Sequence, residues 1–64
     1  MKIVLDDGTT KELQIKKAVI EDILSSMGIN PVEVIVAKNG KITSECDLVQ
    51  SSDQLKIIRI IHGG

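Results

Sequence analysis

One segment of this chain has the spacing of an amphipathic helix, and this limits the possible folds more than any other feature. Between residues 17 and 27 the apolar side chains recur at intervals that place them on one stripe of a helix. That stripe consists of Val19, Ile20, Ile23, Leu24 and Met27. Gly28 follows at the place of a helix C-cap, and Pro31 prevents continuation. We therefore predict one helix over residues 17–27, with this stripe in the core.

The other apolar runs have the β-branched composition or the alternation of strands. We expect strands over residues 2–6, 10–15, 32–37, 41–43 and 55–61. Asp7-Gly8 and Asn39-Gly40 are favoured in tight hairpin turns, because Gly tolerates a positive φ. The polar stretch 44–53, with Leu48 and Val49 as internal anchors, predicts a compact loop that has room for one helical turn.

The order of these elements, β-β-α-β-β-β, predicts an α+β fold. One helix covers only one face of a sheet, so the opposite face should be open to solvent. The first and last strands are apolar on both sides, which is typical of buried central strands, and we expect them to be parallel neighbours. This arrangement is a β-grasp, the ubiquitin-like roll.

The composition sets the scale of the protein. The chain has 64 residues, of which 22 are Ile, Val or Leu and none is Phe, Trp or Tyr. A domain of this size hides only about 60% of its unfolded surface, so most apolar side chains are needed for the core and little is left for a catalytic pocket. We predict a single domain over residues 1–64 that is not an enzyme, binds no cofactor and is a monomer when alone.

Charge and cysteine content exclude other classes. Eight basic against nine acidic residues, with no aromatic side chain, argue against nucleic-acid binding. No apolar run is long enough for a membrane span or a signal peptide. A single cysteine, Cys46, cannot form an internal disulfide. We therefore expect a cytoplasmic protein.

The sequence ends on Gly63-Gly64, directly after an apolar strand. Gly63 and Gly64 have no Cβ, so we expect residues 62–64 to be a thin, flexible tail that could enter a narrow active site on another protein. The carboxylate at Gly64 is ionised at neutral pH and is a poor electrophile. An enzyme with ATP could convert it to an acyl-adenylate. A sulfur nucleophile would then produce a thiocarboxylate, and a lysine amine would produce an isopeptide bond.

The chain resembles the ThiS/MoaD family of small sulfur carriers, the prokaryotic relatives of ubiquitin. The resemblance rests on the N-terminal hairpin, the helix ending near Gly28, the segment from Val34 to Gly40, and the ending from Asp53 to Gly64. It implies that Gly64 is adenylated and thiocarboxylated, with Gly63 as its slender neighbour. It also implies an E1-like adenylyltransferase that uses ATP, and a sulfur-accepting synthase or tRNA thiolation enzyme, as partners.

Three further side chains are candidates for function. If Leu55 and Ile57 face the helix, Ile58 and Ile60 face the open side, where an apolar patch would suit docking to the activating enzyme. His62, beside the Gly-Gly pair, is a candidate for contact with the partner's acidic groups.

Cys46 lies between Glu45 and Asp47, whose charges disfavour a nucleophilic thiolate, so we interpret it as a loop thiol. With one His and one Cys, the chain has no metal-site spacing.

Three functions remain open on the sequence. The leading one is a sulfur carrier for thiamine, molybdopterin or tRNA thiolation. The second is a protein modifier attached through Gly64 to lysines, of the archaeal type. The third is a β-grasp interaction subunit whose Gly-Gly ending has no reactive role.

Overall fold

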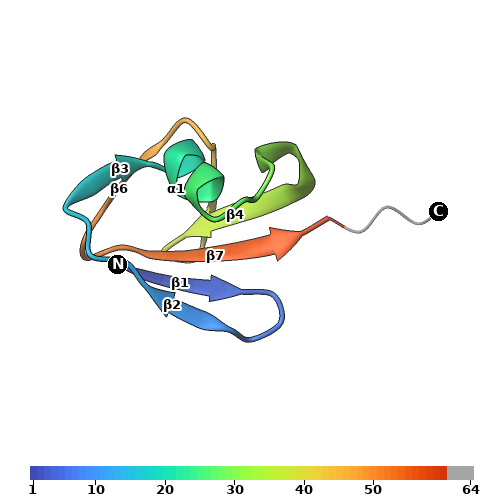
Figure 1. Cartoon of the computed structure of the whole chain (residues 1–64), viewed down its shortest axis with the longest axis horizontal. Coiled ribbons are helices and arrows are strands. Elements are labelled where there is room, and N and C mark those ends of the chain that lie inside the picture. Colours follow the sequence, from blue (N-terminus) through green and yellow to red (C-terminus); the bar gives the residue numbers. More distant parts are fainter. Residues whose placement is uncertain (61–64) are drawn as a thin grey trace.

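A computed structural model describes residues 1–60, in which a five-stranded mixed sheet carries an α-helix on one face (Figure 1). The elements in chain order are β1 (Lys2–Leu5), β2 (Thr10–Glu12), β3 (Lys17–Val19), α1 (Ile20–Ser26), the 3₁₀ turn η1 (Pro31–Glu33), β4 (Val34–Lys38), β5 (Lys41–Thr43), β6 (Leu48–Gln50) and β7 (Gln54–Arg59). The expected tail over residues 62–64, and the end of the last predicted strand at Ile61, lie outside the described residues.

The large sheet has the order β2-β1-β7-β4-β5, with β7 at its centre. β1 and β7 are parallel neighbours, paired from Lys2 opposite Gln54 to Leu5 opposite Ile57. β4 runs antiparallel to β7 on the other side. The predicted α+β, β-grasp arrangement is therefore confirmed, including the pairing of the first and last strands.

The predicted turn at Asn39-Gly40 has the backbone of a hairpin connection. Asn39 has φ 51° and Gly40 has φ 86°, so both central residues lie in the left-handed region. Asn and Gly are the residues that tolerate this region best, which explains why this pair joins β4 to β5.

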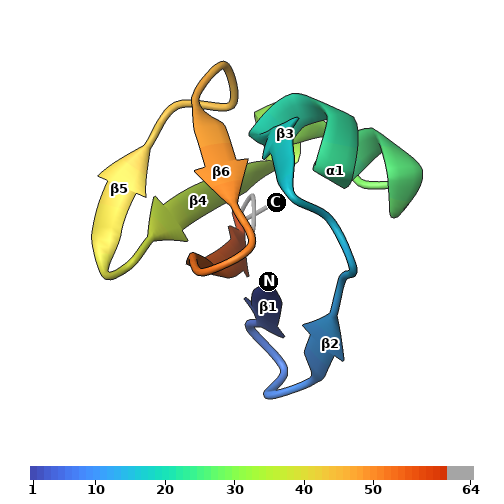
Figure 2. The ribbon, with the colours of Figure 1, turned by 90° about the vertical axis from the view of Figure 1, so that its left-hand side faces the viewer.

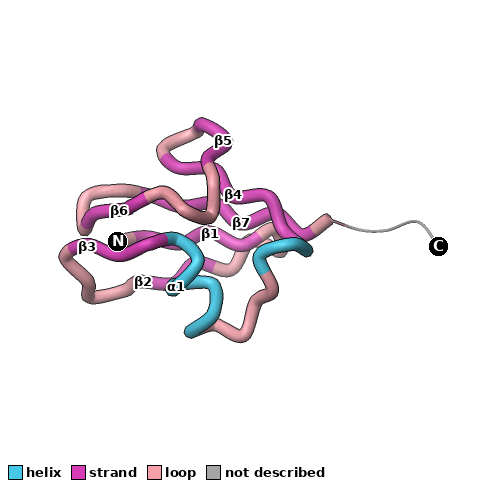
Figure 3. Tube along the Cα trace, turned by 90° about the horizontal axis from the view of Figure 1, so that it is seen from above, coloured by secondary structure: helices cyan, strands magenta, loops and turns pink. Residues whose placement is uncertain are grey.

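The core lies between the helix and the sheet (Figure 3). Its fully buried members come from distant parts of the chain and are all aliphatic: Ile3, Ile20, Leu24, Val49 and Leu55. Ile23 is also buried and Met27 packs against the cluster, so most of the predicted helical stripe does form core.

The helix nevertheless begins later than predicted, at Ile20 instead of residue 17. Residues 17–19 form β3, which pairs with β6 in a separate two-stranded ribbon (Figure 2). Ala18 and Val19 are both half-buried; Ala18 lies opposite the buried Val49 and packs against the core cluster, whereas Val19 is not part of that cluster. The prediction of a loop over 44–53 was therefore wrong at β6, because pairing with a distant strand supplies the hydrogen bonds that a short polar segment lacks locally.

Other strand boundaries also differ from the prediction, and the last strand ends at Arg59 instead of residue 61. β2 ends at Glu12 instead of residue 15, although Leu13 and Ile15 still pack against the core from an irregular segment. The strand expected from residue 32 begins at Val34, because Pro31 opens the 3₁₀ turn η1 and the Asn30 side chain accepts a hydrogen bond from the Val32 N–H (3.2 Å).

Candidate functional site

The central strand β7 presents different side chains to the two faces of the sheet. Leu55 and Ile57 are buried beneath the helix. Ile58 and Ile60 remain 38% and 37% exposed. Since side chains alternate along a strand, Ile58 lies on the face away from α1, as the sequence predicted, and Ile60 follows directly after the end of β7 at Arg59. That this face binds a partner stays a prediction.

A third isoleucine extends this surface. Ile35 of β4 is the direct cross-strand partner of Ile58 and is 39% exposed. We call Ile35, Ile58 and Ile60 the outer patch. The sequence alone does not place Ile35 on this surface, because its position opposite Ile58 depends on the register between β4 and β7. Residues 34–37 are all apolar, so no polar–apolar alternation shows which of them faces outward.

The main chain at the end of β7 is held on both sides. The Arg59 N–H donates to Asp6 Oδ2 (3.0 Å), from the turn that follows β1. The next amide, of Ile60, donates to the Glu33 carbonyl (2.8 Å), at the end of η1. The polypeptide is therefore fixed as far as Ile60, the last described residue. The candidate residues His62, Gly63 and Gly64 follow it and lie outside the described part of the chain.

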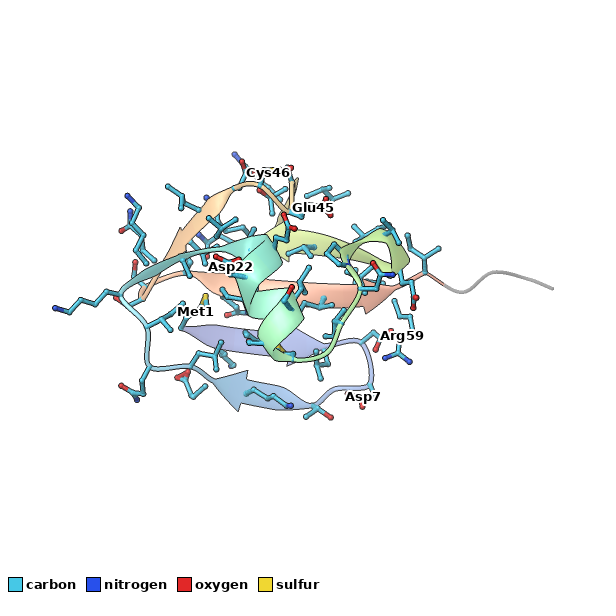
Figure 4. The ribbon with its side chains drawn as sticks, turned by 45° about the horizontal axis from the view of Figure 1, so that its top comes forward. Met1, Asp7, Asp22, Glu45, Cys46 and Arg59 are labelled. Carbon is cyan, nitrogen blue, oxygen red and sulfur yellow. The ribbon has the colours of Figure 1, made fainter. Side chains whose placement is uncertain are left out.

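The turn between β1 and β2 lies at the same end of the sheet as Arg59 (Figure 4). Asp7 Oδ1 accepts a hydrogen bond from the Thr9 N–H (2.8 Å). Hydrogen bonding from the Thr9 hydroxyl, and then from its N–H, holds the pKa of Asp7 below its ordinary value, with a smaller contribution from the charge of Arg59. Asp7 is therefore an anion at neutral pH that stabilises its own turn.

Asp53, which directly precedes β7, has a structural role. Its carboxylate accepts hydrogen bonds from the Asn39 side-chain amide (2.9 Å) and the Gln50 N–H (2.8 Å). These two donors, Asn39 first, hold the pKa of Asp53 below its ordinary value. Asn39 Oδ1 in turn accepts from the Gln54 N–H (2.9 Å). This network ties the β4–β5 hairpin to the start of β7.

Cys46 lies in the connection between β5 and β6, at the opposite side of the molecule from Asp7 and Arg59 (Figure 4). Its side chain is exposed, and its N–H donates to Ser44 Oγ (3.1 Å). Asp47 in the same turn is hydrogen-bonded by the Thr43 hydroxyl and the Ser44 N–H, which hold its pKa below the ordinary value. Cys46 therefore belongs to a hydrogen-bonded surface turn, whose residues Thr43, Ser44 and Glu45 line a cavity together with Ile35 of the outer patch.

Two classes of site are not found in residues 1–60. No three acidic, histidine or cysteine side chains of this part of the chain are grouped so that they could hold a metal ion. The described helices include none with the length and apolarity needed to cross a membrane.

Comparison with known proteins agrees with this architecture. The sequence model of the family described as small archaeal modifier protein 2 matches residues 1–61. An uncharacterized protein of Archaeoglobus fulgidus is 34% identical over 64 residues, which cover all of this chain and 94% of the relative.

Two solved structures share the fold. The crystal structure of a thiamine biosynthesis protein, ThiS, of Geobacter metallireducens has a TM-score of 0.69 at 17% identity, with both chains fully covered. A solution structure of a thiamine biosynthesis protein of the same organism has a TM-score of 0.64 at 19% identity and covers all of this chain and 88% of that one. The predicted resemblance to small ubiquitin-fold proteins of the ThiS type is confirmed.

Proposed function

Because the chain belongs to the small archaeal modifier protein 2 family, we propose that it is the protein substrate of an E1-like activating enzyme that adenylates Gly64. The observation that carries this proposal is the position of the outer patch. Ile35, Ile58 and Ile60 form an exposed apolar surface on the strand end that leads into the Gly63-Gly64 ending. A partner bound there would be next to the segment on which it acts.

In this proposal the activating enzyme and this chain each contribute a part of the adenylation reaction. The activating enzyme supplies the ATP site, and an oxygen of the Gly64 carboxylate attacks the α-phosphorus with loss of pyrophosphate. In the leading proposal, sulfur at the oxidation level of hydrosulfide then attacks the carbonyl carbon. AMP leaves, and Gly64 becomes a thiocarboxylate. This cytoplasmic carrier would donate the sulfur to thiamine, molybdopterin or tRNA thiolation through a synthase or a tRNA-modifying enzyme.

A second outcome of the same activation is favoured by the family match, because that family is described as a modifier. The nitrogen of a lysine side chain on another protein would attack the activated carbonyl and form an isopeptide bond. Both functions use one adenylation step, so they differ only in the nucleophile that follows.

Intact-mass analysis of the protein isolated from its own cells separates these functions. A sulfur carrier should show replacement of one oxygen by sulfur at Gly64, and a modifier should leave Gly-Gly remnants on lysines of other proteins. A Cys46→Ser chain is the matched control, because sulfur added to the thiol would disappear and sulfur at Gly64 would remain. If neither species is found, and the chain keeps full function after deletion of Gly63 and Gly64, the remaining function is that of an interaction subunit.

A further inference from the structure

The parallel pairing of β1 and β7 ends before β7 does. Leu5 opposite Ile57 is the last pair, and β7 continues to Arg59. At this point the backbone of β1 turns away: the Leu5 carbonyl accepts the Gly8 N–H (3.0 Å), and the Leu5 N–H donates to the Thr9 carbonyl (2.8 Å). The chain after Leu5 therefore enters the hairpin turn, and no residue of β1 is paired with the last two residues of β7.

A side chain replaces the missing main-chain partner. Asp6 Oδ2 accepts the Arg59 N–H at 3.0 Å, although the two residues are 53 positions apart in the sequence. A carboxylate that accepts an N–H forms a charge-assisted hydrogen bond, which is stronger than a neutral one. On the opposite edge of β7, the Ile60 N–H is held by the Glu33 carbonyl. Two consecutive amides, of Arg59 and Ile60, are therefore hydrogen-bonded to acceptors on opposite sides of the chain, and we call this pair of bonds the clamp.

The turn that carries Asp6 is itself well held. Asp7 accepts the Thr9 N–H, and Gly8 adopts φ 90°, which a side chain would disfavour. The carboxylate of Asp6 is therefore placed by a short, internally bonded hairpin before any partner arrives. Such preorganisation lowers the entropy lost when a reactive group is brought into an active site.

We propose that Asp6 is a positioning residue for activation of the carboxyl end, an inference that rests on the proposed function. By holding the Arg59 amide, Asp6 fixes the direction in which the chain leaves the sheet relative to the outer patch. Without this acceptor the Arg59 N–H turns to water and the last residues of β7 separate from the sheet. The docked protein then presents Gly64 to the activating enzyme less often.

The test compares Asp6→Ala with Asp6→Asn. Alanine removes both the charge and the acceptor, whereas asparagine removes the charge but keeps a side-chain oxygen that can accept the Arg59 N–H. Amide hydrogen exchange followed by NMR reports the clamp without any partner. Adenylation kinetics, measured as ATP–pyrophosphate exchange with the activating enzyme of the source organism, report positioning.

In Asp6→Ala we expect exchange at the Arg59 amide to become at least about tenfold faster, while the amides of Leu55 and Ile57 keep their protection. We expect kcat for adenylation to fall by about two- to tenfold, the range that loss of one hydrogen bond allows. KM should change by less than about twofold, because the outer patch is untouched. Asp6→Asn should restore both the protection and most of kcat.

Three results would overturn the proposal. The first is unchanged exchange at Arg59 in Asp6→Ala, and the second is unchanged kcat despite faster exchange. The third is an Asp6→Asn chain as impaired as Asp6→Ala, which would indicate that the charge acts on the partner directly. Failure of the proposed function is a separate observation, since the wild-type chain itself would then show no ATP–pyrophosphate exchange.

Discussion

Ile57 and Ile58 are adjacent in β7 but lie in opposite environments. Ile57 is 3% exposed within the core, whereas Ile58 belongs to the outer patch. Truncation of a buried isoleucine to alanine costs about 2–5 kcal/mol, while a change at an exposed position usually stays within about 0.5 kcal/mol. One strand therefore presents a buried and an exposed isoleucine at adjacent positions, because its side chains alternate in direction.

The first prediction uses this separation. Ile58→Asp should keep the wild-type urea midpoint within error but lose adenylation by the activating enzyme, because a carboxylate at the patch would have to be desolvated on docking. Leu48→Asp is the matched control. It introduces the same charge at another exposed aliphatic residue, in β6 of the separate ribbon, and should leave adenylation unchanged. Normal adenylation of Ile58→Asp would contradict docking at the outer patch.

Asp53 leads to a prediction on pH. Its pKa in the folded chain lies below the ordinary 3.8 because of hydrogen bonds from Asn39 and Gln50. The ionised form is thus favoured by folding. Its stabilisation is present above pH 3.8, the unfolded value, and is lost as pH falls through the lowered folded pKa. Asp7 and Asp47 are lowered in the same direction and should add to this loss.

Asp53→Asn should accordingly lower the urea midpoint at neutral pH and reduce the further drop on acidification, because one of the two acceptor oxygens and the titrating group are removed together. Urea titrations at pH 7 and at pH values around and below 3.8 measure both effects. Ser52→Ala, an exposed neighbour in the same turn, should behave like the wild type. An unchanged acid profile in Asp53→Asn would show that this network does not link folding to pH.

At the scale of elements, the β3–β6 ribbon closes one side of the core. Each of its strands has three residues, and a ribbon this short is not stable alone in water. It forms because Val49 is fully buried against the helix and sheet residues of the core cluster. The Ile20 N–H also donates to the Asp47 carbonyl (3.0 Å), so the residue before β6 supplies an acceptor to the first residue of α1.

We therefore expect Val49→Ala to destabilise the fold by about 2 kcal/mol, from two lost buried methyl groups plus the cavity that remains. Leu48→Ala, at the neighbouring exposed position of β6, removes more side chain but should cost less than about 1 kcal/mol. Equilibrium urea unfolding of the two variants measures the difference. Equal costs would mean that β6 contributes little to the core.

At the scale of the whole molecule, the protein combines a closed aliphatic core with a reactive group proposed to lie outside it. The buried core of the described residues runs from Met1 to Ile57 in sequence, so it is complete before the Gly-Gly ending. The proposed activity needs no pocket of its own, because the activating enzyme would supply both the ATP and the enclosed site.

Deletion of Gly63 and Gly64 should therefore leave the urea midpoint and the amide exchange of the core unchanged, and should abolish adenylation. Insertion of two alanines after Gly64 is the corresponding control, since it keeps both glycines but moves the carboxylate. A deletion chain that still supports full activity in the cell would exclude both the carrier and the modifier.

Much of this architecture follows from local patterns in the sequence. The stripe from Ile20 to Met27, the Asn39-Gly40 turn and the alternation between Ile57 and Ile58 are set by backbone geometry over a few residues, and each is present in the structure. The Gly63-Gly64 ending is also read from the sequence, and the chemistry proposed for it stays a prediction, because these residues lie outside the described part of the chain.

Other features depended on contacts between distant segments. The segment at residues 17–19 has the spacing of the helix that follows it, yet it pairs with β6 because backbone hydrogen bonds and the burial of Val49 favour a strand there. Ile35 joins the outer patch, and Asp6 reaches Arg59, only through the register of β7 with β4 and β1. Periodicity reports the shape of one segment, whereas register is a property of two, and only the folded chain brings them together.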